Sequence, residues 1–305
     1  MTAISQDELG GPEVLKLVTL PTPEPGISEI LVRVHAASVN PIDAANRQTG
    51  VFLGQPPFVL GWDISGTVEA VGLGVTLFEP GDEVFGMLPF PQGHGAYAQY
   101  AVGPTRAFVR KPARPCPRRR HTDGRTHCLA VTGGHGRSRR GCRVLIIGAA
   151  GGIGHLAVQI AKARGAHVTA LASGEDANFI RALGADEVVD YKGTDFTQVV
   201  SDQDVVLDVV GGDYPGRALD VLKRGGMLVS TQPPSLAPVA EAAAERGIRL
   251  AGILVEADDL GMSALADLAN AGKLMPTIAA TYPLDQAAVA ESTKHGPGKV
   301  VLTVM

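Results

Sequence analysis

The residues of this chain that most clearly suggest chemistry are the glycines that follow residue 147. An apolar run, Arg143–Ile147, precedes them, and apolar residues at helical spacing predict a helix from about Ile153 to Arg164. The turn between the two reads Gly148-Ala-Ala-Gly151-Gly152-Ile153-Gly154. Glycines let a backbone approach a pyrophosphate closely, and the start of a helix offers free N–H groups to an anion. The pattern predicts a dinucleotide site, and the alternative is a tight turn without a ligand.

The end of the next predicted strand bears on which dinucleotide binds. An NAD site usually places a carboxylate there, about 20 residues after the turn, to hold the ribose 2′-hydroxyl. This chain has Ala172-Ser173-Gly174, which is small and uncharged, so a 2′-phosphate could fit. Glu175 and Asp176 follow directly and would repel that phosphate unless they point away. The sequence therefore favours NADP(H) over NAD(H).

Two kinds of pattern surround this turn. The first hundred residues contain short strand-like runs separated by Gly and Pro turns, which predict a small β-rich domain that is partly barrel-like. The runs are Val14–Leu20, Ile30–Ser38, Ile64–Val71 and Tyr97–Val102. After residue 143, apolar strands alternate with helical segments, and this alternation predicts a parallel sheet covered on both faces.

The predicted elements of the second half follow the glycine turn in regular order. The strands are His167–Leu171, Glu187–Val189, Val205–Val210, Met227–Ser230 and Arg249–Val255, and Lys299–Val304 closes the chain. The helices are Ala177–Leu183 and Val239–Arg246. We therefore expect an α/β protein in which a doubly wound parallel sheet of the Rossmann type accompanies a β-rich domain.

Composition limits the classes of protein that fit. The chain has 305 residues, of which 45% are hydrophobic and 19% charged, so it can bury a large core and suits two domains. No apolar run approaches the roughly 20 residues that span a bilayer. The first residues lack a basic stretch followed by an apolar one, so we expect no signal peptide, no membrane partner and a cytoplasmic location.

Further motifs run nearly end to end. They are Ala37-Ser-Val-Asn40-Pro41-Ile-Asp43, Leu60-Gly-Trp62-Asp63-Ile-Ser-Gly66, Gly81-Asp-Glu-Val-Phe85-Gly86, Gly95-Ala-Tyr97-Ala-Gln-Tyr100, Leu183-Gly-Ala-Asp186, Val189-Asp190-Tyr191, Asp208-Val-Val-Gly211-Gly212, Gly225-Gly226 and Gly298-Lys299-Val-Val-Leu302. Together with the glycine turn they make the chain resemble the zinc-free quinone oxidoreductase (zeta-crystallin-like) branch of the medium-chain dehydrogenase/reductase superfamily.

The resemblance implies a domain organisation. A GroES-like catalytic domain would occupy residues 1–122, completed by residues 272–305, and a Rossmann dinucleotide-binding domain residues 143–271. Members of this branch are usually homodimers. Residues 112–142 do not match and form an anomalous Arg-rich segment.

Zinc can be judged from individual positions. Metal-dependent relatives use a Cys where this chain has Asn40, and a His-Glu pair where it has Trp62-Asp63. Neither Asn nor Trp is a zinc ligand. A structural zinc lobe needs four closely spaced cysteines, and this chain has three in all. We therefore expect no zinc.

Without a metal, the chemistry depends on positioning. NADPH would give a hydride to a quinone or an α,β-unsaturated carbonyl, and the protein would stabilise the oxyanion. By resemblance, Asn40 is the candidate hydrogen-bond donor, although Asn40-Pro41 could simply cap the following helix. Asp43 could orient the loop or equally be a surface carboxylate at a helix start, and Tyr97 fits a core role better than a catalytic one.

The resemblance also assigns cofactor contacts. Gly151, Gly152, Ile153 and Gly154 would hold the pyrophosphate, and Ser173 and Tyr191 the adenosine 2′-phosphate. Gly211 would lie beside the nicotinamide ribose, and Lys299 near the cofactor. One departure weakens the preference for NADP(H), because the basic residue often found after the second strand falls at about Asp176.

The Arg-rich segment has three competing interpretations. From Lys111 to Arg143, both included, the chain carries ten cationic residues and one acidic residue, Asp123, and also all three cysteines. A Cys/His metal site is disfavoured because no tight ligand pair exists. An arm that binds nucleic acid is possible but disfavoured. We favour a pair of compensating frameshifts, because suitable codons for Thr126–Arg137 read one nucleotide on spell Leu-Thr-Ala-Trp-Gln-Ser-Leu-Val-Asp-Thr-Ala-Gly, which resembles the family's missing helix at the floor of the active site.

The sequence thus predicts an NADPH-dependent, metal-free reductase of quinones or enones. The alternative is a non-catalytic NADP(H)-binding protein, either a pseudoenzyme or a redox sensor, that touches nucleic acid through its basic segment.

Overall fold

The computed structural model describes residues 1–93, 95–112, 141–256 and 258–304, so most of the Arg-rich segment and its three interpretations lie outside the described residues. The chain divides into two compact units. The described part of the first comprises residues 1–93, 95–112, 256, 258–270 and 278–304, and that of the second residues 141–255 and 271–277. Each is described by itself, and the domain boundaries expected from the family stay predictions.

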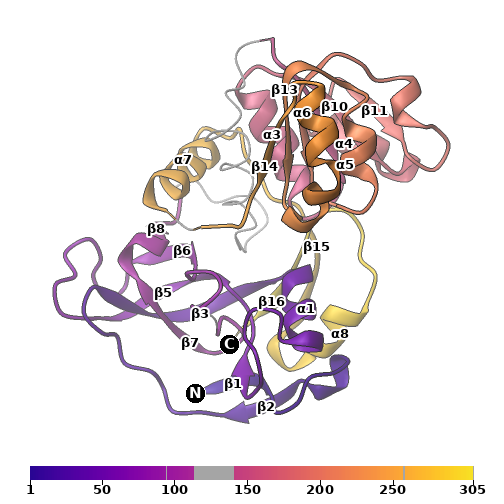
Figure 1. Cartoon of the computed structure of the whole chain (residues 1–305). Helices are drawn as coiled ribbons and strands as arrows, with labels where there is room; N and C mark the ends of the chain where they lie inside the picture. The colour runs from indigo at the N-terminus through magenta and orange to yellow at the C-terminus, as the bar shows by residue number, and fades with distance from the viewer. Residues whose placement is uncertain (94, 113–140, 257, 305) are drawn as a thin grey trace. The chain divides into compact units, whose positions relative to one another are not determined.

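The first unit is built on a seven-stranded sheet in the order β15-β16-β3-β5-β6-β8, with β7 paired to β3 (Figure 1). Its strands are β3 (Glu29–Val39), β5 (Asp63–Val71), β6 (Glu83–Met87), β7 (Tyr100–Pro104), β8 (Phe108–Arg110), β15 (Ile278–Pro283) and β16 (Lys299–Thr303). The C-terminal β16 pairs antiparallel with β3, where Val300 faces Val39. The chain end therefore completes a sheet that the first hundred residues begin.

Smaller elements surround this sheet. A second sheet of three strands has the order β2-β1-β4. The elements are β1 (Thr2–Gln6), η1 (Pro12–Val14), β2 (Lys16–Thr19), α1 (Pro41–Thr49), β4 (Phe58–Val59), η2 (Thr105–Ala107), α7 (Asp259–Asn270), η7 (Leu284–Gln286) and α8 (Ala287–Ser292). Helix α7 packs against β8 and η2, and α8 packs against β15 and β16.

The second unit is a six-stranded parallel sheet in the order β11-β10-β9-β12-β13-β14. Its elements are β9 (Arg143–Ile147), α3 (Gly154–Ala163), β10 (His167–Ala172), η4 (Gly174–Asp176), α4 (Ala177–Ala182), β11 (Glu187–Asp190), η5 (Phe196–Gln198), β12 (Gln203–Asp208), α5 (Tyr214–Ala218), β13 (Leu222–Ser230), η6 (Pro233–Val239), α6 (Ala240–Glu245) and β14 (Arg249–Gly252). This order reverses between β9 and β12, as in a doubly wound Rossmann sheet.

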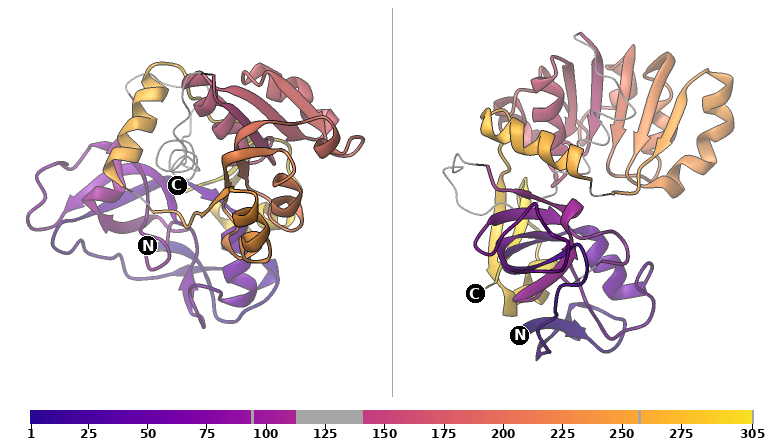
Figure 2. Two further views of the ribbon diagram at one scale, coloured as in Figure 1. Left: turned by 45° about the horizontal axis from the view of Figure 1, so that its top comes forward. Right: turned by 90° about the vertical axis from the view of Figure 1, so that its left-hand side faces the viewer.

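Helices cover both faces of this sheet (Figures 1 and 2). Right-handed crossovers that move outward in opposite directions from the centre place α3 and α4 on one face and α5 and α6 on the other. Central strands are therefore buried on both sides, as their continuous apolar sequences predict. A core cluster of buried residues includes Leu145 and Ile147 of β9, Val206 of β12 and Leu228 of β13. The predicted fold class is confirmed.

Single strands differ from their predicted bounds for physical reasons. The run Val205–Val210 was expected to be strand throughout, but β12 ends at Asp208. The Asp208 carboxylate accepts the backbone N–H groups of Val210 and Gly211, each at 2.9 Å, and these bonds turn the chain away from the sheet. Among the described residues, no helix is both long and apolar enough to cross a membrane.

Candidate active site

The glycine turn of the second unit connects β9 to α3, as the sequence predicts. Gly148 has φ +80° and Gly151 N donates to Gly148 O over 3.1 Å. A Cβ on Gly154 would lie 2.2 Å from Gly148 O and 2.6 Å from Ala149 Cα, so only glycine fits there. A Cβ on Gly151 would meet nothing closer than Gly148 O at 3.4 Å. Backbone thus faces open space at Gly151, and Gly151, Gly152, Ile153 and Gly154 form a turn that fits a pyrophosphate.

His155 in the first turn of α3 holds this turn in place. Its Nδ1 lies 2.9 Å from Gly151 O, and its Nε2 lies 3.1 Å from Thr277 N, which must be the donor of that bond. A neutral ring protonated on Nδ1 satisfies both contacts. Four residues on, Gln159 makes two hydrogen bonds with the backbone of Met275. One face of α3 therefore binds the segment 271–277, and His155 has a structural role.

Ser173 and Tyr191, the predicted contacts of the 2′-phosphate, follow the neighbouring strands β10 and β11. Tyr191 N donates to Ala172 O over 3.2 Å, and the Tyr191 side chain is half exposed. The Ser173 hydroxyl donates to Asp176 Oδ2 over 2.7 Å. The structure brings the two residues to one end of the sheet, and it turns Asp176 towards Ser173 rather than away.

Lys192 is a cation beside this pair that the sequence reasoning missed. Its Nζ lies 3.1 Å from Glu175 Oε1, and both side chains are largely exposed. The family pattern places a basic residue shortly after the second strand, whereas Lys192 follows the third strand, β11. The signal was nevertheless present, because Lys192 comes directly after Tyr191.

Gly211, the predicted neighbour of the nicotinamide ribose, follows β12 with φ +81°. Its N–H is held by the buried carboxylate of Asp208, which also accepts the Ser230 hydroxyl over 2.9 Å. The turn after β12 is therefore fixed at the same sheet edge as the glycine turn after β9, because the carboxyl ends of parallel strands meet there.

In the first unit, Asn40 lies with two charged residues at one end of three adjacent strands. Asn40 follows β3, Asp63 begins β5, and Lys299 begins β16. Asn40 Nδ2 donates to Asp63 Oδ2 over 3.0 Å, and the Lys299 ammonium donates to Asn40 Oδ1. Lys299 Nζ also lies 3.7 Å from Asp63 Oδ2, and both charged side chains are almost fully buried. Lys299, predicted as a cofactor contact, is thus joined to the predicted catalytic residue.

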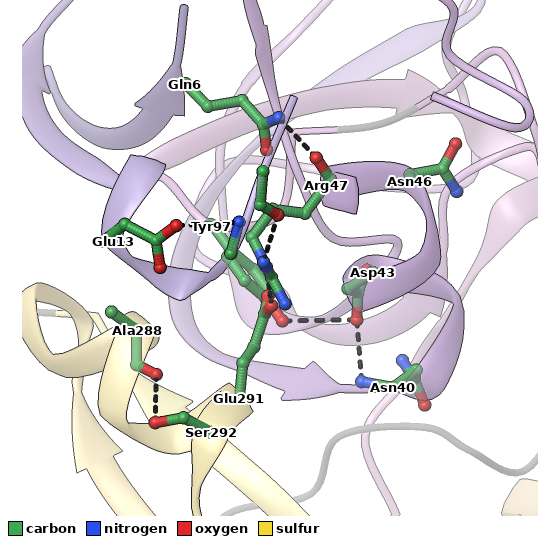
Figure 3. Close-up of polar contacts among 12 residues, drawn as sticks. Gln6, Glu13, Asn40, Asp43, Asn46, Arg47, Tyr97, Ala288, Glu291 and Ser292 are labelled. Carbon is green, nitrogen blue, oxygen red and sulfur yellow. Dashed lines mark hydrogen bonds and ion pairs between the residues drawn. The ribbon is translucent and has the colours of Figure 1, made fainter. Parts of the chain in front are cut away.

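Asp43, the second predicted catalytic residue, is completely buried at the start of α1. Its Oδ2 accepts Asn40 N over 2.7 Å, as in a capping box, and the Tyr97 hydroxyl over 3.2 Å (Figure 3). Burial raises the pKa of Asp43 well above its usual range, and the nearby Glu291 carboxylate adds to this shift. The expectation that Asp43 could be a surface carboxylate does not hold, because the helix start packs into the core.

A buried ion pair supports the other end of α1. Arg47 Nε lies 2.7 Å from Glu291 Oε2 of α8, and both side chains are inaccessible (Figure 3). Arg47 Nη1 donates to Gly10 O, and Gln6 donates to Arg47 O over 3.0 Å. Burial raises the pKa of Glu291, while Arg47 opposes that shift. Helix α1 is therefore fixed at both ends.

Comparisons with known proteins agree with this architecture. The family model described as "Alcohol dehydrogenase GroES-like domain" matches residues 26–113, and that described as "Zinc-binding dehydrogenase" matches residues 183–302. The bovine (Bos taurus) "NAD(P)H oxidoreductase RTN4IP1, mitochondrial" is 32% identical over 91% of this chain and 82% of its own length. The mouse (Mus musculus) "Quinone oxidoreductase" is 32% identical over 98% of this chain and 96% of its own.

A solved structure shows the same likeness. The quinone oxidoreductase from Coxiella burnetii superposes with a TM-score of 0.91 at 34% identity, covering 100% of this chain and 99% of that one. The fold and the site thus define an NAD(P)H-dependent type of oxidoreductase. The chain belongs to the medium-chain dehydrogenase/reductase superfamily, where its relatives include quinone oxidoreductases, and the resemblance inferred from the sequence is confirmed.

The zinc in the name of one family model does not fit the residues of this site. The Lys299 ammonium already occupies the Asn40 oxygen and lies beside Asp63, so a divalent cation placed there would meet a buried positive charge. Trp62 offers no ligand atom. Within the described ranges, no three His, Cys, Asp or Glu side chains form a group that could hold a metal.

Proposed function

We propose that this protein is an NADPH-dependent, metal-free reductase of quinones or α,β-unsaturated carbonyl compounds. The observation that carries the proposal is the Asn40 amide, which an ammonium and a carboxylate hold at the end of the GroES-like sheet in a family of oxidoreductases. Bound NADPH supplies the hydride. The residues of the chain must then bind the cofactor, hold the acceptor and stabilise the negative charge that develops on its oxygen.

Each candidate residue has a part in this scheme. The glycine turn, Gly151 to Gly154, binds the pyrophosphate, and Gly211 gives the nicotinamide ribose a close approach. Asn40 donates an N–H to the acceptor's carbonyl oxygen. The acceptor carbon gains the hydride, the oxygen gains the charge, and a proton from water then completes the reduction. Asp43 holds the backbone N–H of Asn40 and so fixes the start of α1.

The preference for NADPH is supported by local chemistry. Strand β10 ends at Ala172, and Ser173-Gly174 follow it without a carboxylate, while Lys192 places a cation close to Tyr191. The bovine relative is named an NAD(P)H oxidoreductase. One contact opposes this preference. The Ser173 hydroxyl donates to Asp176, and this bond must break before the hydroxyl can bind a phosphate. Homodimeric assembly and a cytoplasmic location remain parts of the proposal.

The test is a fluorescence titration with NADPH and NADH side by side, followed by NADPH oxidation with a simple benzoquinone. We expect tighter binding of NADPH, and quinone-dependent oxidation. Lys192→Ala should weaken NADPH binding by about tenfold and leave NADH unchanged, since one charge-assisted hydrogen bond is lost. Lys223→Ala is the matched control, because Lys223 is an exposed lysine of the same unit that is paired with Asp204.

Other results would change the proposal. A preference for NADH would mean that Asp176 binds the ribose hydroxyl instead of yielding to a phosphate. Tight NADPH binding without oxidation by any quinone or enone would favour the non-catalytic alternative. A mobility shift with nucleic acid that disappears at high salt would add support to that alternative.

A further inference from the structure

The cluster of Asn40, Asp63 and Lys299 combines three side chains that differ in whether they donate or accept hydrogen bonds. A lysine ammonium can only donate hydrogen bonds, and a carboxylate can only accept them. An asparagine amide has one accepting and one donating end, which are easily exchanged by a 180° flip. With Lys299 on one side and Asp63 on the other, only one of the two orientations makes both bonds.

The three residues come from chain segments that the sheet brings together. Asn40 follows the last residue of β3, and β3 lies between β5 and β16 in the sheet. Asp63 and Lys299 are the first residues of those two neighbours. They therefore flank Asn40 on both sides through the register of the strands, which is rigid compared with a loop.

Burial strengthens the constraint. Lys299 and Asp63 are 3% and 4% exposed, so their charges are poorly screened and their geometry is held by packing. Asn40 itself is half-buried. One hydrogen of its Nδ2 goes to Asp63, and among the described residues no acceptor takes the other. The amide therefore keeps one oriented N–H for a further partner.

We propose that Lys299 and Asp63 are positioning residues that lock the Asn40 amide with its free N–H available to the acceptor's oxygen. This inference rests on the proposed function, in which Asn40 is the donor. It differs from the role that the family resemblance gives Lys299, because the ammonium acts on Asn40 and not on the cofactor. Asp63, which had no assigned role, becomes the second half of the lock.

The kinetic test uses the full-length protein with NADPH and benzoquinone. Asn40→Ala should lower kcat by about 10²-fold, the usual loss for one oxyanion donor. Lys299→Met should lower kcat by about 10-fold or more and leave the NADPH dissociation constant within about 2-fold. In the Asn40→Ala background, Lys299→Met should add no further loss, since it acts through the residue already removed.

Two more variants keep the test decisive. Lys299→Met alone leaves Asp63 as an unpaired buried charge, so the double variant Lys299→Met with Asp63→Asn removes both charges and protects folding. Lys299→Arg, which retains a donor, should restore part of the kcat. Lys16→Met is the control, because Lys16 pairs with Asp7 on the surface of the same unit.

A spectroscopic readout separates this inference from the proposed function. In ¹⁵N-labelled protein without cofactor, the side-chain amide of Asn40, assigned by its loss in Asn40→Ala, should give one sharp, slowly exchanging pair of signals. In the double variant it should broaden or split. Unchanged amide signals would overturn the lock, whether or not the protein reduces quinones. A large rise in the NADPH dissociation constant of Lys299→Met with kcat preserved would return Lys299 to the cofactor.

Discussion

Asn40 and Asp43 lie three positions apart at the start of one helix but have different environments. The Asn40 side chain turns towards Asp63 and Lys299, whereas Asp43 is buried and binds Tyr97 and the Asn40 backbone. The two roles considered for Asn40, a helix cap and an oxyanion donor, are therefore compatible. Asp43 supplies the capping bond to the Asn40 backbone, and the Asn40 amide also binds Asp63 and Lys299.

Only one oxygen of the buried Asp43 carboxyl has hydrogen-bond partners among the described residues. Both hydrogen bonds reach Oδ2, while Oδ1 is buried with no partner among the described residues. An asparagine could place its oxygen at the Oδ2 position, keep both bonds and remove the buried charge. We expect Asp43→Asn to raise the melting temperature at pH 8, at about 2–4 °C for each kcal/mol gained.

The sign of the pH dependence follows from the raised pKa. Burial, with Glu291 and Asp63 adding and the hydrogen bond from the Asn40 backbone and Lys299 opposing, lifts the pKa of Asp43 above its value in the unfolded chain, about 3.9. The folded protein then binds the proton more strongly than the unfolded chain does. The stability that Asp43 contributes to the protein is therefore present at low pH and is lost as the pH rises through the folded pKa. The advantage of Asp43→Asn should grow from pH 4 to pH 8.

A surface carboxylate gives the opposite sign as a control. The Arg110 side chain lowers the pKa of Asp82, so Asp82→Asn should reduce stability at neutral pH, and the difference should vanish in acid. Thermal melts of both variants at several pH values measure the effect. If Asp43→Asn destabilised the protein most at pH 8, Asp43 would have to be ionised in the native state.

At the scale of elements, buried strands and their turns were the most predictable. The central strand β9 was predicted with the bounds observed, because a strand buried on both faces must be apolar throughout. The lock around Asn40 was not predictable, since Lys299 lies 259 positions away and only the pairing of β16 with β3 brings it near. The buried pair of Arg47 and Glu291 escaped prediction for the same reason.

The glycine turn allows folding and cofactor binding to be tested separately. Gly151→Ala should fold with a melting temperature within about 2 °C of the native one, because its Cβ makes only an ordinary contact at 3.4 Å. NADPH binding should weaken by at least about tenfold, since a methyl group would stand where the pyrophosphate approaches. Calorimetry and a fluorescence titration on the same sample measure both.

Two further glycines bracket this result. Gly154→Ala should lower the melting temperature itself, because its Cβ would collide with backbone atoms of Gly148 and Ala149. Gly296→Ala has no atom within 4 Å and should change neither property. Full NADPH affinity in a stable Gly151→Ala protein would show that the turn is only a tight connection, the alternative that the sequence left open.

At the scale of the whole molecule, the sequence predicted one sheet in each unit. The periodicity of the apolar residues could not show which segments of the chain belong to which unit. Helix α7 has an ordinary amphipathic sequence, and only its packing on β8 and η2 places it with the first unit. Only the family resemblance predicted that the end of the chain returns to the first unit, where β16 pairs with β3. Local patterns carry no information about such distant pairings.

The Arg-rich segment makes the last prediction one about the whole chain. Replacing Thr126–Arg137 by the alternative-frame sequence Leu-Thr-Ala-Trp-Gln-Ser-Leu-Val-Asp-Thr-Ala-Gly should raise kcat/KM for quinone reduction by about 10²-fold, the cost typical of misplaced reacting groups. The NADPH dissociation constant should stay within about threefold, because the assigned phosphate contacts lie in residues 151–191. Steady-state kinetics and titration of both proteins, with resequencing of the gene, provide the test. Equal activity in the two proteins, or a gene that encodes the arginines in frame, would end the frameshift explanation and make the Arg-rich sequence a native part of this enzyme.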